Sequence, residues 1–206
     1  MTSKLTFKSR DGLSIEGEID EPFGPHASLV LCHPHPKMGG TLNAPLLLAL
    51  RDEMLQRGWR VLRFNFRGIG KSEGESATGT NEVNDALGAL DAIPTDAPIA
   101  IAGWSFGGAV GVRAAAQSDV AACVALAPSV DARPHITEGI PPNVDPKCPV
   151  LIVVGSNDQH VSPKRAEEWA ADHGATFISM PGANHFFWAK YEDLAKIVAE
   201  WLEQNV

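Results

Sequence analysis

The sequence contains no long hydrophobic run and no excess of basic residues. Its longest purely aliphatic stretch covers residues 150–154, whereas a membrane-spanning helix needs about 20 apolar residues. Residues 1–8 have neither the apolar core nor the small-residue cleavage site of a signal peptide. The 17 Lys and Arg residues are outnumbered by 25 Asp and Glu residues, so the net charge is −8. We therefore expect no membrane span, no surface for nucleic acid or anionic lipid, and a cytoplasmic location.

Cysteine is also rare. The chain has three cysteines, Cys32, Cys123 and Cys148, and each lies in or beside an apolar strand-like segment. An odd number of cysteines cannot pair completely within one chain. Disulfides persist mainly in oxidising compartments, whereas free buried thiols are usual in cytosolic proteins. We interpret all three as buried thiols, in preference to a disulfide or a reactive cysteine.

The remaining composition is that of an ordinary globular protein, with 44% hydrophobic and 20% charged residues. A chain of 206 residues is long enough for one domain with a substantial core and short for two. No internal repeat or linker divides it. We predict a single domain over residues 1–206.

The strand-like segments are of two kinds. Residues 5–8 and 13–19 alternate apolar and polar side chains on either side of Arg10-Asp11-Gly12, and an Asp-Gly turn is a strong hairpin signal. The later segments are almost continuously apolar, as in strands that are buried on both faces. They cover residues 28–32, 59–66, 99–102, 121–127, 150–154 and 176–180.

Segments of helical character lie between these strands. The predicted helices cover residues 44–58, 81–93, 107–117 and 163–174, followed by a C-terminal helix with the apolar stripe Leu194, Ile197, Val198, Trp201 and Leu202. Thr80 and Ser162 are the predicted N-caps of the second and fourth helices. Strands that alternate with helices indicate an α/β fold. We expect a twisted, mostly parallel sheet with helices on both faces and the antiparallel N-terminal hairpin at its edge.

The segment Gly103-Trp104-Ser105-Phe106-Gly107 connects a predicted strand to a predicted helix. The chain must turn sharply there, which strains the backbone of Ser105 and exposes its hydroxyl. Glycines two residues before and after the serine avoid collisions with the strand and the helix, which is the pattern of a nucleophile elbow. The spacing predicts Ser105 as a nucleophile. Ser72, in the glycine-rich segment 67–74, is a reserve candidate without an elbow around it.

A serine hydroxyl is a poor nucleophile near neutral pH and needs a base. His185 lies in Gly182-Ala183-Asn184-His185-Phe186, directly after the last predicted strand. Ligands bind at the carboxyl ends of parallel strands, so His185 is our candidate base, with an ordinary surface-loop histidine as the alternative. Four other histidines are weaker candidates because of their positions in the chain: His26, His135, His160 and His173.

The base in turn needs an acid that orients its ring. Asp158, in Gly155-Ser156-Asn157-Asp158, follows the strand at residues 150–154 and therefore lies at the same edge of the sheet. The alternative is a turn aspartate that makes only a local hydrogen bond. Asp131 is the main rival for the acid, and Asp145 is a weaker one.

The loop His33-Pro34-His35-Pro36-Lys37-Met38-Gly39-Gly40 follows the strand that we expect beside the elbow strand. A backbone N–H from this loop, together with that of Phe106, would form an oxyanion hole. The two prolines have no N–H, so His35 is the first candidate donor and Lys37 the second. The alternative is a metal site at His33 and His35, but no matching pattern of carboxylates or cysteines accompanies them.

With these motifs the chain resembles the α/β-hydrolase superfamily over nearly its whole length, and most closely its small, lidless branch of dienelactone-hydrolase-like and carboxylesterase-like proteins. The matching motifs are His33-Pro34-His35-Pro36 with Gly39-Gly40, residues 66–72, Gly103-Trp104-Ser105-Phe106-Gly107-Gly108, Gly155-x-x-Asp158 and residues 182–186. The resemblance implies acyl hydrolysis without a cofactor or metal, with Ser105 as nucleophile, His185 as base and Asp158 as the acid that orients it.

Two departures refine the resemblance. Larger relatives insert a lid where this chain has only residues 128–149, so we expect no lid domain and an open site. Dienelactone hydrolases carry a cysteine at the elbow, whereas Ser105 moves this chain toward esterases.

We therefore expect a serine carboxylesterase that acts on small or medium acyl esters. Three apolar residues near the motifs are candidates for substrate binding, with core packing as the alternative: Met38, Trp104 and Phe186. Phe106, Phe187 and Trp188 are further candidates of the same kind. Thioester, lactone or peptide cleavage and acyl transfer would use the same residues, and a non-catalytic ligand-binding scaffold is a third hypothesis. The sequence names neither the physiological substrate nor the oligomeric state.

Overall fold

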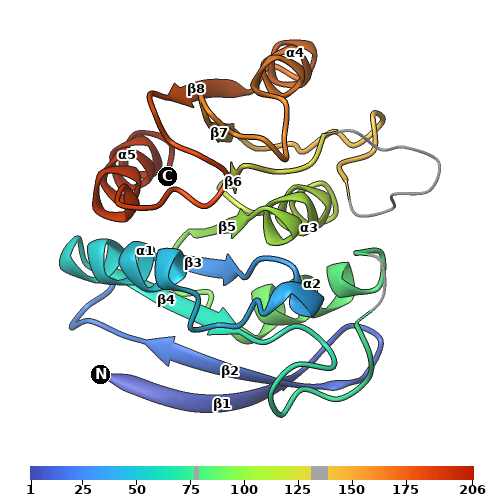
Figure 1. The fold of residues 1–206 in the computed structure, drawn as a ribbon. Coiled ribbons are helices and arrows are strands. Elements are labelled where there is room, and N and C mark those ends of the chain that lie inside the picture. Colours follow the sequence, from blue (N-terminus) through green and yellow to red (C-terminus); the bar gives the residue numbers. More distant parts are fainter. Residues whose placement is uncertain (77–78, 131–138) are drawn as a thin grey trace.

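The structure, a computed structural model, describes residues 1–76, 79–130 and 139–206. Its strands are β1 (Thr2–Lys8), β2 (Ser14–Asp20), β3 (Ala27–Cys32), β4 (Trp59–Phe64), β5 (Ile99–Trp104), β6 (Ala122–Leu126), β7 (Val150–Gly155) and β8 (Thr176–Met180). Within these residues they form one sheet in the order β1-β2-β4-β3-β5-β6-β7-β8 (Figure 1). This arrangement confirms the predicted α/β fold.

The N-terminal hairpin lies at one edge of the sheet. β1 and β2 pair antiparallel from Thr2 opposite Asp20 to Lys8 opposite Ser14, and β2 pairs antiparallel with β4. All remaining pairs are parallel. β3 pairs directly with β5, so the strand before the His33 loop lies beside the elbow strand, as predicted.

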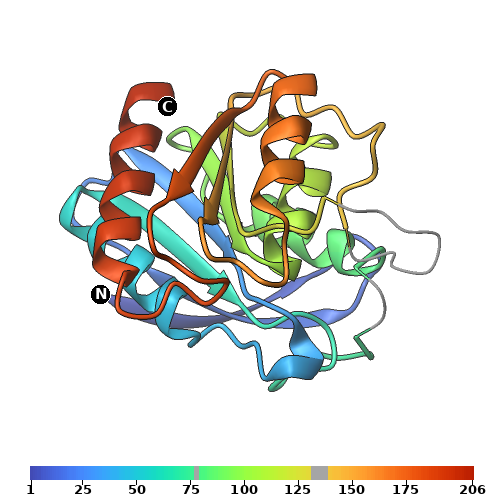
Figure 2. The ribbon, with the colours of Figure 1, turned by 45° about the horizontal axis from the view of Figure 1, so that its top comes forward.

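Helices cover both faces of the sheet. They are the short 3-10 helix η1 (Pro36–Met38) and the α-helices α1 (Pro45–Gln56), α2 (Glu82–Ala92), α3 (Phe106–Ala115), α4 (Pro163–Asp172) and α5 (Tyr191–Asn205). α1 and α5 pack on one face, and α2, α3 and α4 pack on the other (Figures 1 and 2). None of the helices in the described ranges is long and apolar enough to cross a membrane.

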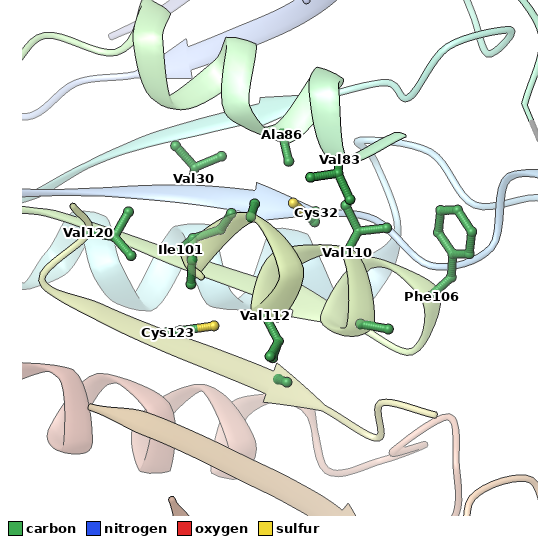
Figure 3. Close-up of a cluster of buried hydrophobic side chains, with 14 of the residues drawn as sticks. Val30, Cys32, Val83, Ala86, Ile101, Phe106, Val110, Val112, Val120 and Cys123 are labelled. Carbon is green, nitrogen blue, oxygen red and sulfur yellow. The ribbon is translucent and has the colours of Figure 1, made fainter. Parts of the chain in front are cut away.

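The two faces have separate cores because successive strand side chains point in opposite directions. In β3, Val30 and Cys32 contribute to the core under α2 and α3, whereas Leu29 and Leu31 contribute to the core under α1 and α5. Full burial of one such side chain contributes about 1.5–3 kcal/mol. Figure 3 shows the first core, in which Cys32 and Cys123 lie among valine, isoleucine and alanine side chains.

The cysteines are free thiols. Cys32 and Cys123 are fully buried, and burial raises the pKa of both thiols, which suppresses the reactive thiolate. Cys148 is only half-buried. The interpretation as buried thiols is therefore confirmed for the first two cysteines and holds in part for the third.

One of the two predicted helix caps is wrong. Ser162 caps α4, since its side chain accepts a hydrogen bond from the Arg165 amide at 3.4 Å. Thr80 does not cap α2, whose N-cap is Asn81 without a side-chain cap bond. Instead, the buried carboxylate of Glu82 reaches back and accepts from the Gly79 amide at 2.9 Å. The first turn of α2 thus carries a carboxylate that holds the preceding loop, and a negative charge at this end of the helix is favourable for the helix dipole.

Candidate active site

Ser105 forms the turn between β5 and α3 with φ 54° and ψ −114°. A positive φ is strained for a residue with a side chain. The flanking glycines make the turn possible, because a Cβ at Gly103 would lie 2.2 Å from the Gly107 carbonyl oxygen. A Cβ at Gly107 would lie 2.3 Å from the Cys32 carbonyl oxygen. The predicted sharp turn is therefore present, and only glycine fits on either side of it.

The side chains of Ser105, His185 and Asp158 form one chain of hydrogen bonds. His185 Nε2 lies 3.0 Å from Ser105 Oγ, and His185 Nδ1 lies 2.9 Å from Asp158 Oδ2. With the ring proton on Nδ1, His185 donates to the carboxylate and accepts from the serine hydroxyl. This is the geometry that base-assisted attack by a serine requires.

The side chain of Asp158 is fully buried, and hydrogen bonds fix its position. Its Oδ1 accepts from the amides of His160 and Val161, both at 2.8 Å, which leaves Oδ2 for His185. Burial raises the pKa of this carboxyl group, but the hydrogen bonds from His185 and the two amides outweigh burial and lower the pKa overall. Asp158 is therefore ionised near neutral pH and can stabilise a positive charge on His185.

The loops that carry Asp158 and His185 are in direct contact. The Asn157 amide donates to the Ala183 carbonyl at 2.9 Å, and a Cβ at Gly155 would lie 2.4 Å from the same oxygen. On the other side, the indole N–H of Trp104 donates to the His185 carbonyl at 3.1 Å. Trp104, the last residue of β5, thus fixes the backbone of the loop that follows β8.

The loop after β3 approaches the elbow from the opposite side. The ring centroids of His35 and Phe106 are 5.0 Å apart. The Lys37 amide donates to Nδ1 of His35 at 3.1 Å within η1, so it is already engaged. Phe106 opens α3, where the first amides have no partner within the helix. The second oxyanion candidate in this loop, the amide of Lys37, therefore already has a hydrogen-bond acceptor.

Two hydrogen bonds of the His33 ring hold this loop in place. Its Nδ1 donates to the Pro34 carbonyl at 2.6 Å, and its Nε2 accepts from the Phe66 amide at 3.0 Å. Burial lowers the pKa of His33 to about 4, so the ring is neutral. Because both ring nitrogens are engaged, the geometry argues against the alternative of a metal site at His33 and His35.

A cavity of about 450 Å³ opens onto Ser105 and His185. Its lining includes Met38, Trp104 and Phe186, the three candidates for substrate contact. Phe106 and Phe187 point into the two cores instead, and Trp188 stacks on Phe186 outside the cavity lining.

The cavity also contains a residue that the sequence analysis set aside. His160 lines the cavity, with its ring centroid 4.9 Å from that of His185. Its closeness to Asp158 in the chain makes His160 a weak candidate for the base in the sequence. The turn that Asp158 makes by accepting from the amides of residues 160 and 161 brings His160 into the site, and an Asx-turn is the signal that could have identified it.

The rival residues lie elsewhere. Ser72 is buried and donates to the Asn65 carbonyl at 2.7 Å, as a structural serine does. Asp145 is exposed and pairs with Lys147. The ring of His173 stacks on Trp169 at the end of α4. His26 packs beside Trp59, before the amino end of β3. Asp131 and His135 fall outside the described residues.

Comparison with known proteins shows the fold family of the chain. A sequence model described as alpha/beta hydrolase fold matches residues 29–145. The structure is similar to an α/β serine hydrolase homologue from Coxiella burnetii, with 28% identity, a TM-score of 0.85 and 97% of each chain covered. It is also similar to an α/β serine hydrolase without a lid from Xanthomonas campestris, with 25% identity and a TM-score of 0.88 over 98% of this chain and 94% of that one.

Among curated sequences, an uncharacterised protein of Rickettsia prowazekii is 29% identical over 97% of this chain and 88% of its own length. The serine hydrolase neighbours support a hydrolase, and the lidless neighbour confirms the expectation of a fold without a lid domain.

Proposed function

Because the chain belongs to the α/β-hydrolase fold family, we propose that it is a serine carboxylesterase that cleaves small or medium acyl esters through an acyl-enzyme. The observation that carries this proposal is the unbroken chain of hydrogen bonds from Ser105 through His185 to the buried Asp158. The strained elbow supports the proposal, since it presents the Ser105 hydroxyl to the cavity.

The first half-reaction follows from these contacts. Ser105 Oγ attacks the ester carbonyl carbon while His185 Nε2 takes the hydroxyl proton. The amides of Phe106 and His35 stabilise the negative oxygen, and loss of one such donor typically costs about 3 kcal/mol. When the C–O bond of the ester breaks, His185 returns the proton to the departing alcohol.

In the second half-reaction His185 takes a proton from water, and the resulting hydroxide attacks the acyl carbon. The bond to Ser105 Oγ breaks, the carboxylic acid leaves, and Ser105 recovers its proton from His185. The ionised Asp158 stabilises the positively charged imidazole in both halves.

The proposal is tested with Ser105→Ala and a matched control. Ser129 also lines the cavity, and its backbone carbonyl accepts from the Ile140 amide, a bond that survives substitution of the side chain. Ser129→Ala therefore removes a second hydroxyl from the same cavity. We expect Ser105→Ala to lower kcat on 4-nitrophenyl butyrate by roughly four orders of magnitude. We expect Ser129→Ala to stay within a few-fold of the unmodified protein.

A fluorophosphonate probe provides a second readout. It should label the unmodified protein and Ser129→Ala but not Ser105→Ala. Labelling of Ser105→Ala, or a folded unmodified protein that neither reacts with the probe nor turns over any ester, contradicts the proposal and revives the hypothesis of a non-catalytic scaffold. The rates of cleavage of thioesters, lactones and peptides by the unmodified protein test the alternative acyl substrates.

A further inference from the structure

One wall of the cavity is built from aromatic rings. The centroids of His160 and His185 are 4.9 Å apart, those of His185 and Phe186 are 5.5 Å apart, and those of His160 and Phe186 are 5.7 Å apart. These three rings come from the loops after β7 and β8. Each ring is within contact range of the other two, so they form a continuous surface.

The wall continues from the floor of the cavity to the protein surface. Phe186 packs edge-on against Trp104 at 6.3 Å and stacks on Trp188 at 4.9 Å with an interplanar angle of 14°. The exposed fraction rises along this series, from 7% for Trp104 to 36% for Phe186 and 64% for Trp188. Between the two outward-facing rings, Phe187 is fully buried and anchors the loop in the core.

The loop after β3 contributes Pro34, His35, Met38, Gly39 and Gly40 to the lining of the same cavity. The aromatic ring among these residues is the imidazole of His35, whose centroid lies 5.0 Å from that of Phe106. The nearby ring of Phe106 packs against Phe66 in the core.

The chemistry of the reaction places the alcohol half of an ester beside the aromatic wall. The departing alcohol oxygen must receive its proton from Nε2 of His185, so the alcohol group lies on the side of the aromatic wall. The carbonyl oxygen lies toward the amides of His35 and Phe106, on the side of the loop after β3. We propose that the substrates are esters of aromatic alcohols, whose ring packs against His160 and Phe186 in the cavity lining. This inference rests on the proposed function.

A matched pair of esters tests the alcohol side. Benzyl acetate and cyclohexylmethyl acetate have the same acyl group and similar primary alcohols, and they differ in whether the ring is aromatic. Aromatic rings gain from edge-to-face and offset-stacked contacts beyond the area they bury, so we expect kcat/KM to favour benzyl acetate by about two- to tenfold. In methyl phenylacetate and methyl cyclohexylacetate the ring belongs to the acyl group, and the alcohol is methanol. For this pair we expect no preference for the aromatic ring.

Variants show which residues cause the preference for benzyl acetate. Phe186→Leu should reduce the preference for benzyl acetate to a ratio of about one, and Trp188→Ala, an exposed position that is safe for folding, should reduce it partly. Phe23→Leu is the control, because Phe23 is fully exposed in the loop before the amino end of β3, away from the cavity. An equal rate for both acetates, an aromatic preference on the acyl side, or a preference that survives both Phe186→Leu and Trp188→Ala overturns the inference.

Binding separates this inference from the proposed function. In Ser105→Ala, quenching of tryptophan fluorescence measures the affinity for the two acetates without turnover. If the unmodified protein is not labelled by fluorophosphonate and cleaves no ester, the proposed function fails. Tighter binding of benzyl acetate than of cyclohexylmethyl acetate, lost in Ser105→Ala/Phe186→Leu, still supports the aromatic wall as the binding surface. Equal binding of the two esters contradicts it.

Discussion

At the scale of single residues, Asp158 offers a specific test of the proposed mechanism. In Asp158→Asn, the amide oxygen can still accept from the amides of His160 and Val161, so the loop keeps its shape. The side-chain NH₂ then faces His185 Nδ1, which must become an acceptor, and Nε2 then carries the ring proton. We expect kcat on 4-nitrophenyl butyrate to fall by roughly 10³- to 10⁴-fold with little change in thermal stability.

Asp145→Asn is the control for this substitution, because Asp145 is an exposed carboxylate that pairs with Lys147. It should leave kcat within a few-fold of the unmodified protein. A comparable loss in both variants, or no loss in Asp158→Asn, would show that Asp158 does not orient the base.

His33 makes stability depend on pH. Burial lowers its pKa to about 4 in the folded protein, whereas an unfolded histidine has a pKa of about 6.5. Between these pH values only the unfolded state binds the proton, so His33 stabilises the fold fully above pH 6.5 and progressively less as the pH falls toward 4. The expected loss between pH 7 and pH 5 is on the order of 2 kcal/mol.

The variant His33→Gln tests whether His33 causes this pH dependence of stability, since glutamine can accept from the Phe66 amide but does not titrate. Its free energy of unfolding in urea should be lower at pH 7 and should change less between pH 7 and pH 5 than that of the unmodified protein. An unchanged pH dependence in His33→Gln would contradict the assignment of this effect to His33.

At the scale of elements, the contact between β3 and the start of α3 positions the elbow. In Gly107→Ala the new Cβ would lie 2.3 Å from the Cys32 carbonyl oxygen, so α3 must move away from β3 and carry the Phe106 amide with it. We expect a loss of about 1–3 kcal/mol in the free energy of unfolding. Because displacements of about 1 Å can cost 10²-fold in rate, kcat should fall by about two orders of magnitude.

Gly111→Ala in the same helix is the control. Its Cβ would meet only the Ile101 side chain, at 3.8 Å, which is an ordinary contact. Alanine is favoured over glycine inside a helix, so the free energy of unfolding of this variant should rise by about 0.5–1 kcal/mol, and its kcat should stay unchanged. If urea unfolding gives the two variants equal stability, the close approach at Gly107 is not what constrains the elbow.

At the scale of the whole molecule, a buried arginine and two carboxylates connect the hairpin, α2 and the loop after β4. Arg67 donates to Asp85 on α2 at 2.7 Å and to Asp11 in the hairpin turn at 2.9 Å. Asp85→Ala removes the fully buried carboxylate and leaves the buried guanidinium with only the partly exposed Asp11, so we expect it to lower the free energy of unfolding by roughly 3–5 kcal/mol. Asp91→Ala, also on α2, breaks an exposed pair with Arg10 and should cost less than about 1 kcal/mol. Similar urea midpoints for the two variants would contradict this difference.

Much of the fold could be predicted because its signals are local. The apolar segments that became β3 to β8 and the Asp-Gly turn of the hairpin each depend on a few consecutive residues. The elbow at Ser105 is equally local, since two glycines and one serine at set spacing describe a single turn. Thr80 was predicted wrongly because α2 begins one residue later than its pattern indicates, with Asn81 as N-cap and no side-chain cap bond.

The candidate site was predictable only in part. The sequence alone determined that Ser105 would lie in a sharp turn and that Asp158 and His185 would follow parallel strands, because both conclusions depend on neighbouring residues. Only the tertiary structure decided that the side chain of Asp158 reaches His185, and that His160 and Trp104 join them. Those contacts connect loops far apart in the chain, and the order in which the strands pack sets their distances.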